Sequence, residues 1–180
     1  MRKELFRGLY VDHSKQVFSY LFGRTGNKDT AADLLQDIFL KVWNRIEVVE
    51  LIPDKERLYW IFSIASNRLT DYYRRSSNKK NIEEKLRIRN DYSTGDISGL
   101  LAGREQFREL ESQINQLPEE LRSILLMKVL GGMNSSQIGN ALNQPPGTIR
   151  YKMVMARRKL AEKLELLETE SIEGRRKPIG

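Results

Sequence analysis

Aromatic, amide, hydroxyl and guanidinium side chains gather on one side of the segment 55–75. When its residues are placed at the roughly 100° steps of an α-helix, one face is apolar: Leu58, Ile61, Phe62, Ala65, Leu69 and Tyr72. The opposite face is polar and aromatic: Tyr59, Trp60, Ser63, Asn67, Thr70, Asp71 and Arg74, with Tyr73 and Arg75 at its edges. This mixture suits an unstacked nucleic-acid strand, because rings stack on bases, amides read base edges and arginines bind phosphates. The alternative is an amphipathic helix in which Trp60 and Tyr73 complete a core.

A second candidate lies near the other end of the chain, where Asn134 and Gln137 are spaced as a capping box before a short helix. Asn143 can adopt the left-handed conformation that ends such a helix. Pro145-Pro146-Gly147-Thr148 then opens another helix, in which Ile149, Met153, Ala156 and Leu160 face inward and basic residues dominate the rest. This pattern predicts a helix-turn-helix whose second helix enters the major groove. The alternative is a surface helix with a solvated basic face.

The segment 29–43 predicts a helix with two contrasting faces. Ala31, Leu35, Ile38 and Val42 form a core stripe, flanked by Leu34 and Phe39. The far side carries Asp33, Gln36, Asp37, Leu40 and Trp43. Large apolar side chains framed by carboxylates indicate a protein-docking surface. Alternatively, Leu40 and Trp43 pack on a neighbouring helix of the same domain.

Composition narrows the function further. The 180 residues carry 31 Lys and Arg against 24 Asp and Glu, a net charge of +7 that favours a polyanionic partner. The chain has no cysteine and one histidine, so we expect neither a metal site nor a cofactor. We find no phosphate-cradling glycine loop and no nucleophile–base pair, and therefore expect no enzyme. The first residues lack a signal-peptide pattern and no apolar run spans a bilayer, so we expect a cytoplasmic protein without direct membrane insertion.

Helical periodicity on both flanks of a polar middle predicts an all-α protein of two small helical domains joined by a flexible linker. We place the first domain at 1–76, the linker at 77–104 and the helix-turn-helix domain at 105–168. The domain after the linker includes a helix that starts near Leu117-Pro118-Glu119 and ends at Gly131-Gly132. The remainder, 169–180, is a tail that is either disordered or left from an expression tag.

Three of these segments, in this order, resemble the sigma factors of bacterial RNA polymerase. Asp33-Leu34-Leu35-Gln36-Asp37 through Trp43 resembles their polymerase-binding helix, and Trp60 through Arg75 resembles their promoter-melting helix. Leu117 through Leu160 resembles their −35-reading domain. With only two domains, the chain is similar to the extracytoplasmic-function (ECF) group of the sigma-70 superfamily.

The resemblance implies a sigma factor that binds core RNA polymerase and directs promoter-specific DNA binding and transcription initiation. Asp33, Gln36, Asp37, Leu40 and Trp43 would dock on the clamp helices of the largest polymerase subunit. The loop Asn44–Asp54 would form a pocket for a flipped base of the −10 element, whose non-template strand would be captured by the next helix: Trp60, Ser63, Asn67, Thr70, Arg74 and Arg75. The −35 element would be bound by the last helix: Thr148, Arg150, Tyr151, Val154, Arg157, Arg158 and Lys159. An anti-sigma partner is implied by the resemblance alone.

Several positions depart from the family pattern. Ser66 stands where arginine is common, and Gly139 replaces a common alanine at a propensity cost of about 1 kcal/mol. Tyr151, Val154 and Met155 are bulky for a base-reading face, so we infer no −35 sequence. Exposed Val154 and Met155 would alternatively contact an inhibitory partner. Two rival functions stay open at this point: a helix-turn-helix regulator acting on duplex DNA without polymerase, and a helical adaptor with no nucleic-acid role.

Overall fold

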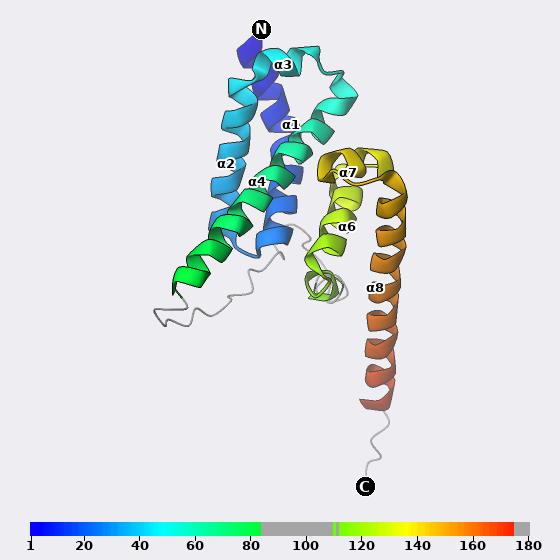
Figure 1. Cartoon of the computed structure of the whole chain (residues 1–180). Helices are drawn as coiled ribbons and strands as arrows, with labels where there is room; N and C mark the ends of the chain where they lie inside the picture. The colour runs from blue at the N-terminus through cyan, green and yellow to red at the C-terminus, as the bar shows by residue number, and fades with distance from the viewer. Residues whose placement is uncertain (84–109, 111, 175–180) are drawn as a thin grey trace.

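The computed structural model describes residues 1–83, Leu110 and residues 112–174 of the chain. Within these residues every regular secondary-structure element is a helix, and the helices form two halves that lie side by side (Figure 1). The predicted all-α architecture of two small helical domains is therefore confirmed. The first half consists of α1 (Arg2–Thr25), α2 (Lys28–Asn44), α3 (Ile46–Leu51) and α4 (Asp54–Glu83). The second consists of α6 (Glu119–Gly131), α7 (Ser135–Leu142) and α8 (Pro146–Gly174).

The helix α1 has no counterpart among the elements that we predicted, because it lacks a single apolar stripe. It contacts α2, α3, α4 and α6, so its buried residues are spread around its circumference. It ends at Gly26, whose positive φ of 64° is readily available to glycine and whose N–H donates to the Phe22 carbonyl at 2.8 Å. Asn27 then caps α2, its side-chain oxygen accepting from the Thr30 N–H at 2.9 Å.

The predicted core stripes of α2 and α4 are confirmed. Ala31, Ile38 and Val42 of α2 are buried, and so are Ile61, Phe62, Ala65 and Leu69 of α4. Leu35, Leu58 and Tyr72 are half-buried against the same core. The opposite faces of both helices therefore point away from the centre of the first half, as the helical period requires.

The predicted helix-turn-helix is also confirmed, down to its caps. Asn134 and Gln137 form a reciprocal capping box, with bonds of 2.8 and 2.9 Å. Asn143 ends α7 in the left-handed conformation, at φ 53° and ψ 45°. Ile149, Met153 and Ala156 of α8 are buried as expected, and Leu160 is half-buried. The fold thus presents the remaining faces of α8 outward.

Some predicted boundaries fall inside helices. The helix α4 continues to Glu83, into the segment 77–104 that we predicted as linker. The segment Asn44–Asp54, predicted as a loop, contains α3. The helix α8 continues to Gly174, into the predicted tail 169–180. Most of the predicted linker, residues 84–104, and the end of the tail, 175–180, lie outside the described residues.

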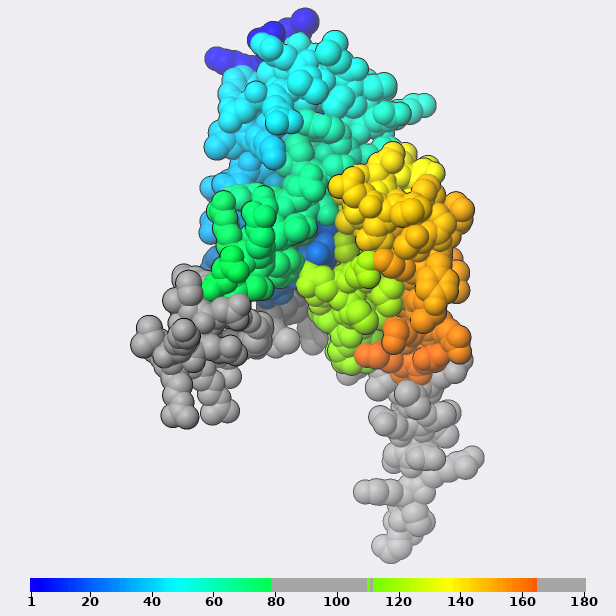
Figure 2. All heavy atoms as spheres, viewed as in Figure 1, coloured from blue at the N-terminus to red at the C-terminus, as the bar shows by residue number. Residues whose placement is uncertain are grey.

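The two halves pack against each other. Contacts join α1 to α6, and α4 to both α6 and α7. Figure 2 shows α7 lying directly against the α4 side of the first half. Buried residues of both halves belong to one continuous apolar cluster, which includes Tyr20 and Phe62 on one side and Ile124, Met127 and Met133 on the other. We call this contact region the seam.

Candidate nucleic-acid interface and protein-docking surface

The predicted docking surface on α2 faces away from the core. Leu40 is 59% exposed, and Asp33, Gln36 and Asp37 are also exposed. Asp37 forms an ion pair with Arg68 of α4, which fixes the position of this carboxylate at the α2–α4 contact. The α2 surface therefore combines an exposed leucine with carboxylate and amide groups that can reach a partner.

Trp43 belongs partly to the docking surface and partly to the fold. Its side chain is 37% exposed, and its ring meets Phe6 of α1 edge-on at a centroid distance of 5.3 Å. Phe39, behind it, contacts Phe6 and Tyr10 in the same edge-on manner. Trp43 therefore packs inside the domain with one side of its ring only. Leu40 does not pack inside the domain.

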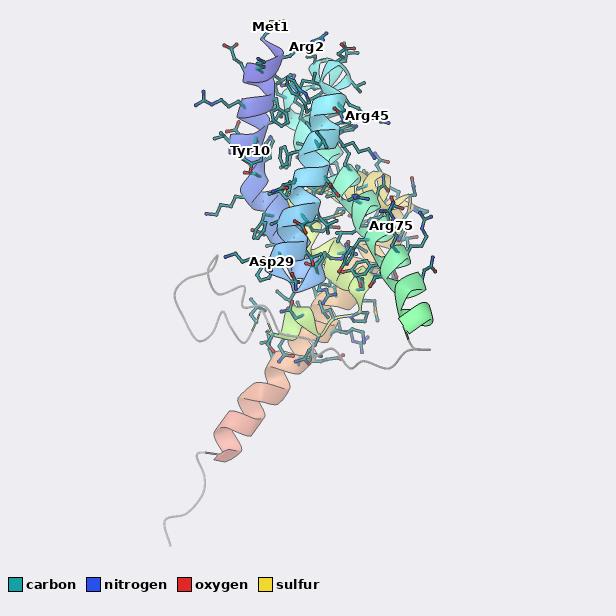
Figure 3. The ribbon with its side chains drawn as sticks, turned by 90° about the vertical axis from the view of Figure 1, so that its left-hand side faces the viewer. Met1, Arg2, Tyr10, Asp29, Arg45 and Arg75 are labelled. Atoms are coloured by element: carbon teal, nitrogen blue, oxygen red, sulfur yellow. The ribbon has the colours of Figure 1, made fainter. Side chains whose placement is uncertain are left out.

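The predicted strand-binding residues of α4 divide into two groups. Asn67, Thr70, Arg74 and Arg75 are exposed, whereas Trp60 and Ser63 nearer the start of the helix are half-buried. The Ser63 hydroxyl donates to the Tyr59 carbonyl at 3.1 Å, so part of its capacity is used within the helix. In Figure 3, Tyr10 on α1 and Arg75 on α4 lie on opposite sides of α2. The face that is open to a ligand is the later part of α4.

Two further residues of α4, Arg74 and Ser66, have their surroundings defined by the fold. Arg74 lies 3.2 Å from the carboxylate of Asp71, one turn earlier. Ser66, where an arginine would resemble the family pattern, is 6% exposed. A buried serine presents no side chain to a phosphate, so Ser66 itself is not part of the exposed face of α4.

Arg57 joins α4 to the end of α3, and our sequence reading did not select it. Its Nε donates to the carbonyls of Val49 at 3.2 Å and Ile52 at 3.0 Å, and its Nη1 pairs with Asp54. The Arg57 side chain is 17% exposed. We call this set of Arg57 contacts the Arg57 clamp. Beside it, α3 exposes two apolar side chains, Val48 at 49% and Leu51 at 85%.

The predicted duplex-binding residues lie on the outer faces of α8. Tyr151 is 66% exposed and Val154 is 61% exposed. Arg150, Arg157 and Arg158 are exposed too, while Thr148 and Lys159 are half-buried. Arg158 pairs with Glu162 one turn later at 3.0 Å. The basic edges of the helix thus flank a central strip of one tyrosine and one valine, a surface that a DNA groove can accept.

The seam contains a polar cluster that sequence reasoning missed. The Arg24 guanidinium donates to the Tyr20 hydroxyl and the Ser123 hydroxyl, both at 2.7 Å, and to the Glu119 carboxylate at 2.7 and 3.0 Å. The Arg24 side chain is 9% exposed. Glu119 lies 95 positions away in sequence, so no local pattern links the two residues.

Electrostatics keep this cluster in one charge state. Burial opposes the charge on Arg24, but Tyr20 and Glu119 outweigh it and raise the pKa of the guanidinium above its ordinary value. Burial, reinforced by Glu119, raises the pKa of the Tyr73 hydroxyl, which donates to the Arg24 carbonyl. Arg24 therefore stays charged and Tyr73 stays protonated throughout the physiological range.

In the described part of the chain, no helix combines the length and the apolar character needed to cross a bilayer. The same residues hold no group of three or more His, Cys, Asp or Glu side chains arranged to bind a metal ion.

Comparison with known proteins gives concordant matches along the chain. Residues 9–79 match the model of sigma-70 region 2, and residues 107–160 match that of sigma-70 region 4. The chain is 22% identical over 175 residues to the ECF RNA polymerase sigma factor SigX of Bacillus subtilis, covering 93% of this chain and 88% of that protein. It is 27% identical over 165 residues to the ECF sigma factor SigL of Mycobacterium tuberculosis, covering 91% and 90%.

Solved structures share the fold. The sigma factor RpoE of Bartonella quintana, in complex with the anti-sigma factor NepR, superposes with a TM-score of 0.73 at 18% identity, covering 89% of this chain and 96% of that one. CnrH, in complex with the cytosolic domain of CnrY, gives a TM-score of 0.61 at 18% identity, covering 91% and 90%. The chain therefore belongs to the ECF group of sigma-70 factors, proteins that bind core RNA polymerase and direct it to initiate transcription at specific promoters.

Proposed function

We propose that three exposed helix faces divide the work of promoter-specific initiation among them. The α2 face, centred on Leu40 and Trp43, binds the clamp helices of the largest polymerase subunit. The α4 face, with Asn67 and Arg74, captures the non-template strand of the −10 element. The outer strip of α8, with Tyr151 and Val154, reads the −35 element while neighbouring basic residues hold phosphates.

One observation supports this assignment: each helix turns its predicted core stripe inward and exposes residues of the face that we assigned to a partner, namely Leu40 on α2, Asn67, Thr70, Arg74 and Arg75 on α4, and Arg150, Tyr151, Val154, Arg157 and Arg158 on α8. Exposed leucine, tyrosine and valine side chains lose contact with water when a partner covers them, which favours binding. On α4 the exposed amide and guanidinium groups suit a strand whose bases are unstacked. The chain thus acts by binding and positioning, not by catalysing a chemical step itself.

The α3–α4 connection has a part in the same scheme. A base flipped from the −10 strand would meet α3 and the start of α4, where Trp60 is half-buried and Val48 and Leu51 are exposed. Flipping costs a few kcal/mol of stacking, which contacts with apolar and aromatic side chains offset.

We also propose a protein inhibitor as a regulatory partner, on the grounds that RpoE was solved with an anti-sigma factor. The exposed Val154 offers one apolar contact for such a partner. Because polymerase and promoter DNA are cytoplasmic in bacteria, the chain would act in the cytoplasm. A duplex-binding regulator that works without polymerase is disfavoured, since the first half of the chain matches a sigma region throughout residues 9–79.

Run-off transcription with purified core polymerase tests this function. Promoter-specific product should appear only when the chain is added, and permanganate should detect unpaired thymines near −10. Asn67→Ala should reduce permanganate reactivity more than duplex affinity, whereas Arg150→Ala should do the reverse. The proposal is contradicted if promoter-specific product forms without the chain. It is also contradicted if the chain yields no product from any promoter in a genomic library.

A further inference from the structure

The connection between α3 and α4 needs an external support. The helix α3 has six residues, too few for a stable isolated helix, and its last carbonyls lack partners within the helix. After it the chain turns through Ile52, which is extended, and Pro53, which cannot donate a backbone hydrogen bond. The position of this connection therefore depends on side chains from other elements.

Arg57 supplies that support from the first turn of α4. A single guanidinium contacts the carbonyl of Val49 in α3, the carbonyl of Ile52 in the connection and the carboxylate of Asp54 at the start of α4. Val49 is fully buried, so the clamp ties an anchored residue to the turn. A planar, multidentate donor can serve these acceptors together, whereas a lysine ammonium offers one point charge.

We propose that Arg57 is a positioning residue for recognition of the flipped −10 base. It holds the exposed Val48 and Leu51 at a fixed place relative to Trp60, which lies one helical turn after Arg57. This inference rests on the proposed function, because it assigns the α3–α4 connection to the displaced base. Without the clamp, Val48 and Leu51 would no longer be held in place relative to Trp60, so the loss should be measurable as weaker discrimination among bases.

The chain offers a matched control in Arg2. Arg2 approaches α3 from α1 through Glu47 at 2.7 Å and Glu50 at 3.8 Å, but its side chain is 54% exposed. Figure 3 places Arg2 at the end of the molecule where α1 begins. Exposed ion pairs of this kind contribute little. Both arginines contact α3, and only one contacts the backbone of the connection.

The experiment compares Arg57→Ala, Arg57→Lys and Arg2→Ala in holoenzyme assembled with core polymerase. Affinity is measured for single-stranded −10 oligonucleotides that carry each of the four bases at every position, and for duplex −35 DNA. Arg57→Ala should reduce discrimination at one −10 position by roughly tenfold, Arg57→Lys should be intermediate, and −35 affinity should not change. Should Arg57→Ala fail to fold, Arg57→Lys decides the question.

The role of Arg57 is overturned if Arg57→Lys and Arg2→Ala discriminate among the four bases as well as the wild type does. In that case Arg57→Ala would either discriminate equally well or fail to fold. Absence of −10 strand binding by the wild-type holoenzyme would instead overturn the proposed function. A uniform loss at all −10 positions in the Arg57 variants also overturns the inference, because a general weakening indicates a purely structural role.

Discussion

Arg24 in the seam and Arg150 on α8 are the same amino acid in opposite situations. Arg24 is almost fully buried and donates to three side chains of this protein. Arg150 is exposed and forms no ion pair with any residue that the structure describes. The first arginine completes the folded state, whereas the second remains available to a phosphate or a base edge.

The same contrast holds between the seam and the outer faces as a whole. In the seam, aromatic and polar groups are enclosed by partners from the other half of the chain. On α2 and α8, leucine, tyrosine and valine side chains face water, although burial would be favourable by roughly 25 cal/mol per Å². Substitutions in the seam should therefore change stability, while substitutions on the outer faces should change binding with little effect on folding.

The largest effect should come from the outer face of α2. Leu40→Ala and Trp43→Ala together remove the two large apolar contacts offered to polymerase, and central contacts of this type are worth about 2–4 kcal/mol of binding free energy. We expect the affinity for core polymerase to fall by roughly 30- to 1000-fold, measured by fluorescence anisotropy with labelled chain. Val129→Ala, at a 68% exposed valine of α6, serves as control and should bind normally.

The single variants Leu40→Ala and Trp43→Ala should differ in thermal stability. Leu40→Ala should leave the melting temperature unchanged, because Leu40 is 59% exposed. Trp43→Ala should lower it slightly, since the ring packs edge-on against Phe6. A loss of helicity in Leu40→Ala would move this residue from the binding surface to the core.

The next effect concerns Gly139 inside α7. A Cβ at this position would lie 2.5 Å from the Gln144 carbonyl oxygen, and the Gln144 N–H donates to the Gly139 carbonyl at 2.9 Å. Gly139→Ala should therefore destabilise the chain by about 1–3 kcal/mol, despite the gain of about 1 kcal/mol in helix propensity. Urea denaturation provides the measurement. Gly147→Ala, whose Cβ would meet only Arg150 at 3.8 Å, should be neutral.

Gly139 also marks the limit of what the sequence could predict. From the sequence alone, glycine at this position predicts only a loss of helix propensity. The structure shows that the chain turns at Asn143 and returns a backbone carbonyl to the space where a Cβ would stand. The capping box and the left-handed Asn143 were predictable because both depend on residues within one turn of each other.

Longer-range features were not predictable in the same way. The core stripes of α2 and α4 follow from their period, because each helix buries one face. The helix α1 escaped prediction because four other helices surround it and dilute its pattern. The pairing of Arg24 with Glu119 and the backbone bonds of Arg57 depend on tertiary packing, which no spacing in the sequence encodes.

A smaller effect should come from the seam. Tyr20→Phe removes a hydroxyl that accepts from Arg24 at 2.7 Å and shares a hydrogen bond with Ser123 at 3.1 Å, while the ring contact with Phe62 remains. The free energy of unfolding should fall by about 1 kcal/mol, a typical cost for one buried hydrogen bond. Tyr10→Phe, at a 45% exposed tyrosine, should change it by less than the error of a urea titration. Equal stabilities for the two variants would contradict a net contribution of the Tyr20 hydroxyl to folding.

The smallest effect should be a pH dependence within the second half. Hydrogen bonds from Lys152 and Gln144, with the Lys152 charge, lower the pKa of Glu120 below its ordinary value of 4.5. A carboxyl whose pKa is depressed by folding stabilises the native state above pH 4.5, and this stabilisation is lost as the pH falls through the lowered pKa. Because the Glu120 side chain is 51% exposed, solvent screening limits the contribution to a few tenths of a kcal/mol.

Glu120→Gln should therefore be slightly less stable than the wild type at pH 7, and the difference should shrink as the pH falls below 4.5, when urea denaturation is followed by circular dichroism. Glu162→Gln provides the matched control, because Glu162 pairs with Arg158 across an exposed helix face. If Glu120→Gln differs from the wild type by the same amount at both pH values, the difference comes from the shape of the amide and not from the charge of the carboxylate. That result would place Glu120 with the neutral packing of the helix-turn-helix, where Lys152 also donates to the Gln144 side chain at 2.8 Å.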